Sequence, residues 1–193
     1  MEESYVEENN VKRKDHPFWE LLQFAIIALL IVVPIRAFVA QPFIVSGSSM
    51  YPTFEDGNYL IVDEISYRFE KPARGDVIIF RFPKDRKKFF IKRIIGLPGE
   101  SLEIKNSSIT IVNKDNPGGF ILNEPYIKNV SYNYESVKLN QDEYFLMGDN
   151  RGASSDSRSW GNVKKNLIIG RAFIRLLPLN EIGLRPGGYE FVE

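Results

Sequence analysis

The sequence predicts a mainly β protein in which one apolar helix precedes a single antiparallel β-rich domain. Two observations support this prediction. A charge-free apolar run occupies residues 24–34, and after residue 40 the pattern changes to short segments rich in Ile, Val, Phe and Tyr, separated by Gly, Pro, Asn and Asp. No later segment shows a long amphipathic helical pattern. The 193 residues suffice for the helix plus one domain, which we expect to be a sandwich or a partly open barrel.

We expect the apolar helix to cross a membrane. Residues 18–40 supply about the 20 residues needed to span a hydrocarbon core of roughly 30 Å. Trp19 suits one membrane interface, and Arg36 can extend its charge towards the headgroups of the other. The basic residues 12–14 favour a cytoplasmic N-terminus. A cleaved secretory signal and a buried core helix are the two alternatives to a membrane span.

This helix divides the chain into three expected parts. Residues 1–17 form a cytoplasmic tail, residues 18–40 the single transmembrane anchor, and residues 41–193 a β-rich domain on the extracytoplasmic face. Because the anchor crosses the bilayer once, the cell membrane is the expected location.

The expected strands of the domain are short and are bounded by turn residues. They cover residues 59–63, 76–82, 89–95, 101–105, 108–113, 143–147 and 167–176. Leu-Pro-Gly at 97–99 and Asn-Pro-Gly-Gly at 116–119 are typical of turns. The basic run at 84–88 separates two strands and is expected to be a solvated hairpin tip, with contact to anionic lipid headgroups as the alternative.

Composition excludes several kinds of chemistry. The chain has no cysteine, which removes disulfides, thiolate metal sites and cysteine nucleophiles. Its one histidine, His16, precedes the anchor, so no imidazole is available in the β domain. Lysine plus arginine and aspartate plus glutamate each number 25, so no global positive field suggests nucleic acid. We expect no metal and no cofactor.

Lys92 is a candidate general base. A lysine amine has a pKa near 10.4 in water and can accept a proton at neutral pH only when burial disfavours the ammonium form. Lys92 lies in Phe-Phe-Ile-Lys-Arg-Ile-Ile at 89–95, a strand pattern with large apolar neighbours. That segment alone fits an edge-strand lysine pointing to water better than a buried base.

Ser49 is a candidate nucleophile. It lies in Ser-Gly-Ser-Ser-Met-Tyr-Pro-Thr at 46–53, directly after a short apolar strand at 43–45. Pro52 and Gly47 favour a constrained turn, which a positioned hydroxyl nucleophile requires. Taken alone, however, this Ser/Gly-rich turn fits a linker after a membrane span better.

The combination of segments is more informative than either residue. Ser-Met-Tyr-Pro-Thr at 49–53 is followed by Lys-Arg-Ile-Ile-Gly-Leu-Pro-Gly-Glu at 92–100, Gly-Asp-Asn-Arg at 148–151 and Ser-Asp-Ser-Arg at 155–158. In this order and this close to an N-terminal anchor, the segments resemble the bacterial type I signal peptidases, the leader peptidases of peptidase family S26. The resemblance extends to residues 75–80, 160–161 and 169–171.

The resemblance implies a role for each matching residue. Ser49 corresponds to the nucleophile and Lys92 to the general base, while Ser154 corresponds to a serine whose hydroxyl orients the lysine amine. Asp156 and Arg158 correspond to a charged pair that supports the active-site loops. The positions of Arg93 and Asp149 are taken as structural.

Two departures from the family pattern affect the site. Many members carry a serine two positions before the nucleophile, and its hydroxyl helps to form the oxyanion hole. Here that position is Gly47, so we expect the oxyanion hole to rest on Ser49 and Gly47 backbone groups. Gly152 and Ala153 replace the Asp-Asn often found before the lysine-orienting serine, with the spacing unchanged.

The implied enzyme is a membrane-bound serine endopeptidase that removes signal peptides from secreted preproteins through an acyl-enzyme, cutting after small residues of the Ala-x-Ala type. Its expected partners are preproteins and membrane lipid, and it is expected to be monomeric. An extended substrate is expected to pair with edge strands and to contact Phe43, Ile44, Val45, Met50, Phe90 and Ile91. The non-enzymatic alternative is a membrane-tethered β module that binds peptides without turnover.

Overall fold

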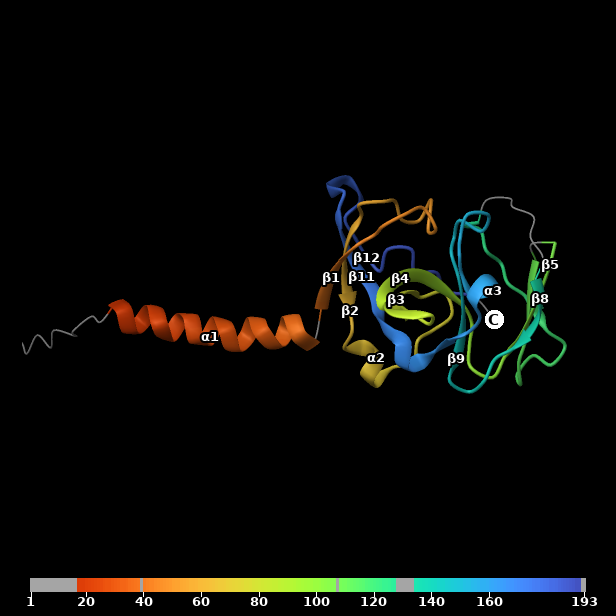
Figure 1. The fold of residues 1–193 in the computed structure, drawn as a ribbon, viewed down its shortest axis with the longest axis horizontal. Coiled ribbons are helices and arrows are strands. Elements are labelled where there is room, and N and C mark those ends of the chain that lie inside the picture. Colours follow the sequence, from red (N-terminus) through yellow and green to blue (C-terminus); the bar gives the residue numbers. More distant parts are fainter. Residues whose placement is uncertain (1–16, 39, 107, 128–133, 192–193) are drawn as a thin grey trace, which may run out of the picture.

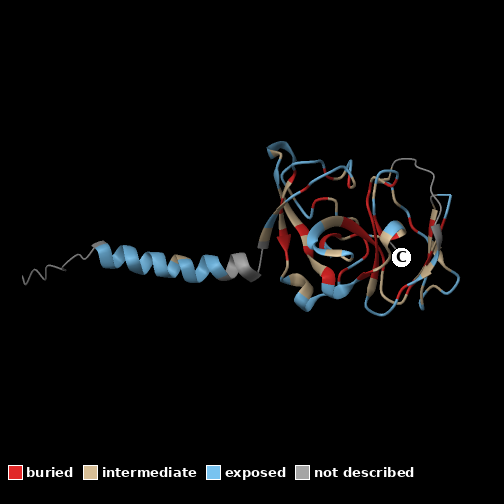
Figure 2. Cartoon of the chain, in the orientation of Figure 1, coloured by how far each residue is buried: buried red, intermediate tan, exposed pale blue. Residues whose placement is uncertain are grey.

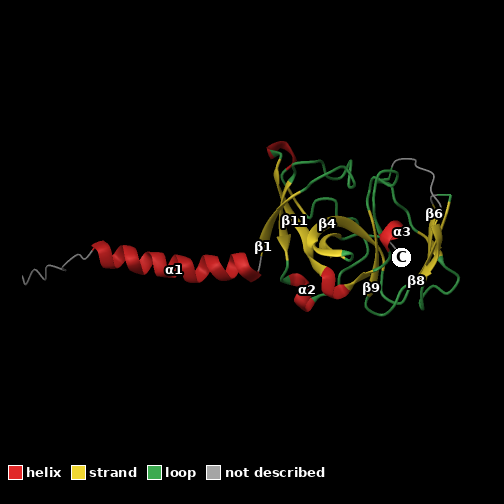
Figure 3. Ribbon diagram, in the orientation of Figure 1, coloured by secondary structure: helices red, strands yellow, loops and turns green. Residues whose placement is uncertain are grey.

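The computed structural model describes residues 17–38, 40–106, 108–127 and 134–191. Two antiparallel sheets form the body of the domain (Figure 3), which confirms the prediction of a mainly β domain. The larger sheet contains β1 (Ala40–Ile44), β2 (Tyr59–Asp63), β3 (Val77–Phe82), β4 (Asp85–Gly96), β9 (Glu143–Met147), β10 (Val163–Lys164), β11 (Ile168–Leu177) and β12 (Gly183–Leu184). The smaller sheet contains β5 (Ser101–Lys105), β6 (Ser108–Val112), β7 (Phe120–Ile121) and β8 (Tyr134–Lys138).

Helices are few and, after the first, short. The first helix, α1 (Pro17–Phe38), has 22 residues and extends away from the sheets (Figure 1). The others are α2 (Ser66–Phe69), α3 (Ser157–Trp160) and the 3₁₀ turns η1 (Lys165–Leu167) and η2 (Leu179–Glu181). Almost all side chains described along α1 are exposed, as its pale blue colour in Figure 2 shows.

The expected tail at 1–17 lies almost wholly outside the described residues. In the part of the chain that the structure describes, no helix is long and apolar enough to cross a membrane.

The larger sheet has the strand order β1-β2-β11-β3-β4-β9-β10, with β12 paired to β11. It curls, so that β1 at its edge approaches β4, and the rings of Phe43 and Phe89 meet with centroids 5.6 Å apart. β4 pairs with β3 along one edge and, from Arg93 onward, with β9 along the other. No ladder joins the first half of β4 to β1 in the described structure. The sheet is therefore a barrel-like wall with a gap between β1 and β4.

Strand alternation lets β4 and β9 serve both layers of the domain. Ile94 and Leu146 point into one core cluster of the larger sheet. Their neighbours Ile95, Phe145 and Met147 point the other way, into a cluster with the small-sheet residues. The smaller sheet, of order β7-β6-β5-β8, thus packs onto the end of β4 that lies just past Lys92.

Three of the expected strands, β2, β5 and β9, have the predicted bounds. The largest difference is at β4, which begins at Asp85 rather than at 89, because Phe82 pairs with Asp85 across a two-residue turn. Most of the basic run at 84–88 is therefore strand rather than loop. The short strands β7, β10 and β12 carry too few residues for an alternating pattern and were not predicted, and the five-residue strand β8 was not predicted either.

Candidate active site

Ser49 lies in a loop whose two ends are anchored in the core. The chain leaves β1 through Val45, which is buried, and re-enters the core at Met50, which is 1% exposed. Between them Gly47 has a φ of +88°, a conformation that favours glycine. The backbone N–H of Asn150 donates to the carbonyl oxygen of Ser49 at 3.1 Å, so a second loop holds the nucleophile from behind.

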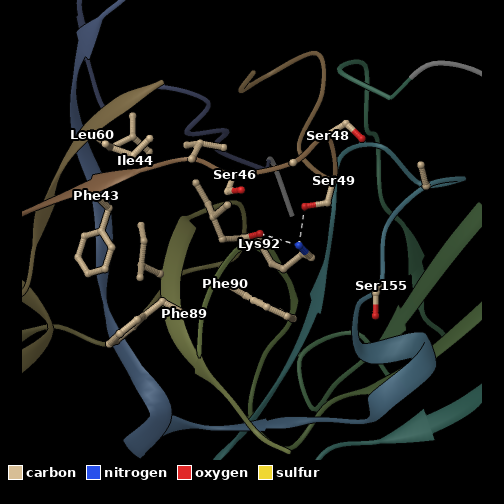
Figure 4. A pocket seen from close by; sticks show the side chains of 15 residues that line it. Phe43, Ile44, Ser46, Ser48, Ser49, Leu60, Phe89, Phe90, Lys92 and Ser155 are labelled. Carbon is tan, nitrogen blue, oxygen red and sulfur yellow. Dashed lines mark hydrogen bonds between the residues drawn. The ribbon is translucent and has the colours of Figure 1, made fainter. Parts of the chain in front are cut away.

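Lys92 lies opposite Ser49 across the gap in the sheet (Figure 4). Its side chain is buried, and Nζ is 2.7 Å from Ser49 Oγ while donating to the carbonyl oxygen of Ile91 at 2.8 Å. Burial lowers the pKa of Lys92 from 10.5 to about 8, and the negative charges of Asp156 and Asp149 oppose this shift. An amine with this pKa is about 10% neutral at pH 7 and mostly neutral above pH 8, and the neutral amine can accept the hydroxyl proton of Ser49.

The loop at 148–151 presses against the nucleophile. Gly148 has no room for a side chain, because a Cβ there would overlap the carbonyl oxygen of Ser49 and the side chain of Ser154. Asn150 adds a side-chain bond from Nδ2 to the carbonyl oxygen of Ser48 at 3.0 Å. The backbone of the nucleophile is therefore positioned by this loop, which lies about 100 residues later in the sequence.

Arg93, next to Lys92, links three separate segments. It forms a bidentate ion pair with Asp149, with Nε to Oδ1 at 2.8 Å and Nη2 to Oδ2 at 2.6 Å, and both side chains are buried. Thr53 Oγ1 donates to the same carboxylate at 2.5 Å, and Arg93 Nη1 donates to the carbonyl oxygens of Gly75 and Gly187. The segments 49–53, 92–100 and 148–151 thus meet at one buried carboxylate.

Asp156 and Arg158 form a second buried pair behind the site. Arg158 donates to Asp156 from Nε at 2.8 Å and from Nη2 at 2.7 Å, and Asp156 is fully buried. Asp156 also accepts from the backbone N–H of Gly148 at 3.1 Å, and Arg158 donates to the carbonyl oxygen of Arg151 at 2.8 Å. The pair ties the start of α3 to both ends of the loop at 148–151.

The structure does not make the expected contact between Ser154 and Lys92. Ser154 Oγ is buried and has no hydrogen-bond partner among the described atoms, since it lies against Gly148 instead. A hydroxyl has three staggered orientations about χ1, and the one present directs the oxygen at the glycine.

The oxyanion prediction needs a correction at Gly47. Its backbone N–H donates to Asp56 Oδ1 at 2.7 Å and is therefore already engaged within the loop. Gly47 thus shapes the loop rather than supplying a donor, and of the two predicted positions only the Ser49 amide remains a candidate.

A cleft of about 460 Å³ runs along the gap between β1 and β4 and ends at Ser49 and Lys92. Of the predicted substrate contacts, Phe43, Ile44, Val45, Phe90 and Ile91 line it. Met50 does not, because its side chain packs into the core with Phe54 and Leu60. The lining residues that were not predicted are Ser46, Ser48, Leu60, Ile79, Phe89, Ala153 and Ser155. No group of three His, Cys, Asp or Glu side chains in the described residues is arranged to hold a metal ion.

A further supporting pair was missed entirely from sequence. Glu124 accepts from Arg151 Nη1 at 2.7 Å and from Nη2 at 2.5 Å, and also from Tyr126 Oη at 2.7 Å. Arg151 Nε in turn donates to the carbonyl oxygen of Gly148 at 3.1 Å. Glu124 lies 27 residues before Arg151, in a segment with no strand or helix pattern, so no local signal identified it.

Comparisons with known proteins identify the family of the chain. Residues 18–177 match the sequence profile of the family described as signal peptidase, peptidase S26. A probable signal peptidase I-2 from Synechocystis is 37% identical, covering 95% of this chain and 86% of the relative. A signal peptidase I from Bacillus amyloliquefaciens is 34% identical, covering 94% and 96%. A crystal structure of a signal peptidase I from Enterococcus faecalis is 31% identical with a TM-score of 0.44, covering 53% of this chain and 97% of that one.

Proposed function

The chain belongs to the signal peptidase family, peptidase S26, and is a signal peptidase I, a serine endopeptidase acting on preproteins that carry signal peptides; within it we propose that Ser49 and Lys92 form the catalytic dyad. The observation that supports this proposal is the 2.7 Å approach of a buried lysine amine to the serine hydroxyl at the end of an apolar cleft. The β domain contains no histidine or cysteine that could replace either residue.

The reaction follows from the protonation state of Lys92. In its neutral form the amine accepts the proton of Ser49 Oγ as that oxygen attacks the scissile carbonyl carbon. The Ser49 amide stabilises the negative oxygen of the tetrahedral intermediate. The ammonium then donates its proton to the leaving amine, and an ester joins Ser49 to the signal peptide. The neutral amine finally activates a water molecule, which hydrolyses the ester and restores the hydroxyl.

The cleft accounts for an extended substrate with small residues before the cut. The free edges of β1 and of the first half of β4 face each other, so a peptide between them can pair its backbone with either strand. Phe90 and Ile91, which precede Lys92 in β4, line the cleft close to the dyad. We propose that Phe90 and Ile91 determine the preference for small residues of the Ala-x-Ala type before the cut.

We further propose that residues 18–40 anchor the enzyme in the cell membrane, with the β domain on the extracytoplasmic face. The support is the unusually apolar surface of α1, on which Phe24 is 71% exposed and Leu30 is 67% exposed without a covering element. We propose membrane lipid as a partner and the monomer as the working form.

The dyad is tested by cleavage of a preprotein in detergent. Ser49→Ala and Lys92→Ala should each abolish cleavage, because each removes one half of the proton transfer. Ser159→Ala and Lys105→Ala are matched controls with exposed side chains outside the cleft and should cleave as the unmodified chain does. Full activity in Lys92→Ala would contradict the assignment of the base.

A further inference from the structure

The hairpin between β3 and β4 carries an unusual concentration of positive charge. Residues 81–88 contain five of the 25 basic residues of a chain that is neutral overall, and a single carboxylate, Asp85. Lys84, Arg86, Lys87 and Lys88 are all exposed. Asp85 lies 3.5 Å from Lys88 Nζ. A second carboxylate, Glu64, lies near Arg81, and burial raises the pKa of Glu64 against the opposing charges of Arg68 and Arg81. These two carboxylates offset less than half of the local positive charge.

The position of this basic hairpin is fixed by the two walls of the cleft. β1 and β4 run in the same direction, because Phe43 meets Phe89 at one point and Ser49 meets Lys92 farther along, as Figure 4 shows. From Phe43 back towards the N-terminus, β1 begins at Ala40, just after α1 ends. From Phe89 back towards the N-terminus, β4 begins at Asp85, next to the hairpin turn, four residues or about 13 Å away at strand spacing. The basic hairpin and α1 therefore join the same end of the domain.

Exposed aromatic side chains lie at this end beside the charges. Phe89 is 43% exposed at the edge of the hairpin. Phe69, 84% exposed, belongs to α2, which begins three residues after Asp63, the partner of Ala40 in the sheet. Basic residues interleaved with exposed aromatic rings are typical of surfaces that contact lipid headgroups.

We propose that the basic hairpin, residues 81–88, binds anionic lipid headgroups at the surface of the membrane that holds α1. The inference rests on the membrane anchorage in the proposed function and adds the surface and the lipid chemistry. Contact at this end turns the opening of the cleft between β1 and β4 towards the bilayer, about 13 Å from the hairpin tip. A substrate that leaves the bilayer can therefore enter the cleft directly.

Energy transfer from a labelled cysteine tests the contact on the full chain, which has no cysteine of its own. Lys84→Cys labels the basic hairpin, and Lys114→Cys labels an exposed loop of the smaller sheet with the same loss of charge. Each labelled chain is reconstituted in vesicles of phosphatidylcholine, or of phosphatidylcholine with roughly 30% phosphatidylglycerol, that carry acceptor-labelled headgroups. We expect transfer from residue 84 to be about twofold higher or more in the anionic vesicles, and transfer from residue 114 to be unchanged.

Charge variants show whether the basic side chains cause this difference. The triple variant Arg86→Gln, Lys87→Gln, Lys88→Gln should lose it, whereas Lys105→Gln, Lys138→Gln, Lys164→Gln, with the same change in net charge, should keep it. Equal transfer in neutral and anionic vesicles, or equal loss in both triple variants, would overturn the inference. Co-flotation with both kinds of vesicle is measured on the same samples. A chain that floats with both but shows no lipid-dependent transfer refutes only the hairpin contact, and one that floats with neither refutes the proposed anchorage.

Discussion

The pH dependence of cleavage follows from the burial of Lys92. With a pKa of about 8, the amine is ~90% neutral at pH 9, ~10% neutral at pH 7 and ~1% neutral at pH 6. A solvated lysine, with a pKa near 10.4, would be only ~0.04% neutral at pH 7. Because only the neutral amine accepts the Ser49 proton, kcat/KM should rise about tenfold per pH unit between pH 6 and 7.5 and level off above about pH 8.5.

The assay is the initial rate of preprotein cleavage in detergent, measured from pH 6 to 10 in overlapping buffers. Circular dichroism at each pH separates loss of fold from loss of the neutral amine. A rate that is flat from pH 6 to 9, or that rises only near pH 10.4, would show that the amine of Lys92 is not the titrating base.

Three further results are expected. Lys92→Met should be more stable than the unmodified chain by up to about 3 kcal/mol in urea unfolding at pH 7. The folded-state pKa lies below the unfolded value, so the amine destabilises the fold fully below about pH 8 and ceases to do so as the pH rises through about 10.5. Gly148→Ala should lower kcat by about 100-fold, because its Cβ displaces the carbonyl of the nucleophile, whereas Gly118→Ala, with open space around it, should not. Glu124→Gln should cost roughly 3–5 kcal/mol by leaving Arg151 buried without its carboxylate, while Glu124→Met with Arg151→Met should recover stability but not kcat. Recovery of both would show that this pair has no positioning role.

Much of the fold was predictable because alternation is a local signal. β5 matches its predicted bounds because apolar residues stand at alternate positions, and β2 and β9 match because each is a short apolar run bounded by turn residues. The pairing of Ser49 with Lys92 was different: the residues are 43 positions apart, and neither segment alone favoured a catalytic reading. Only the order of four motifs predicted that the fold brings them together.

What could not be predicted depends on where side chains point after the chain turns. Met50 follows the nucleophile and was expected in the cleft, yet the turn directs it into the core. The amide of Gly47 was expected to face substrate, yet it binds Asp56 nine residues later. Glu124 reaches Arg151 from the loop that follows β7, and such long-range ion pairs have no signature in the local sequence.

The central claim is that Ser49 carries the acyl group and that Lys92 creates the nucleophile. Rapid acid quench during preprotein cleavage, followed by proteolysis and mass spectrometry, measures this directly. The account predicts the mass of the signal-peptide fragment, joined as an ester, on the peptide containing Ser49 in the unmodified chain, and no such adduct in Lys92→Ala. An adduct on another residue, or one on Ser49 at undiminished level in Lys92→Ala, would contradict it.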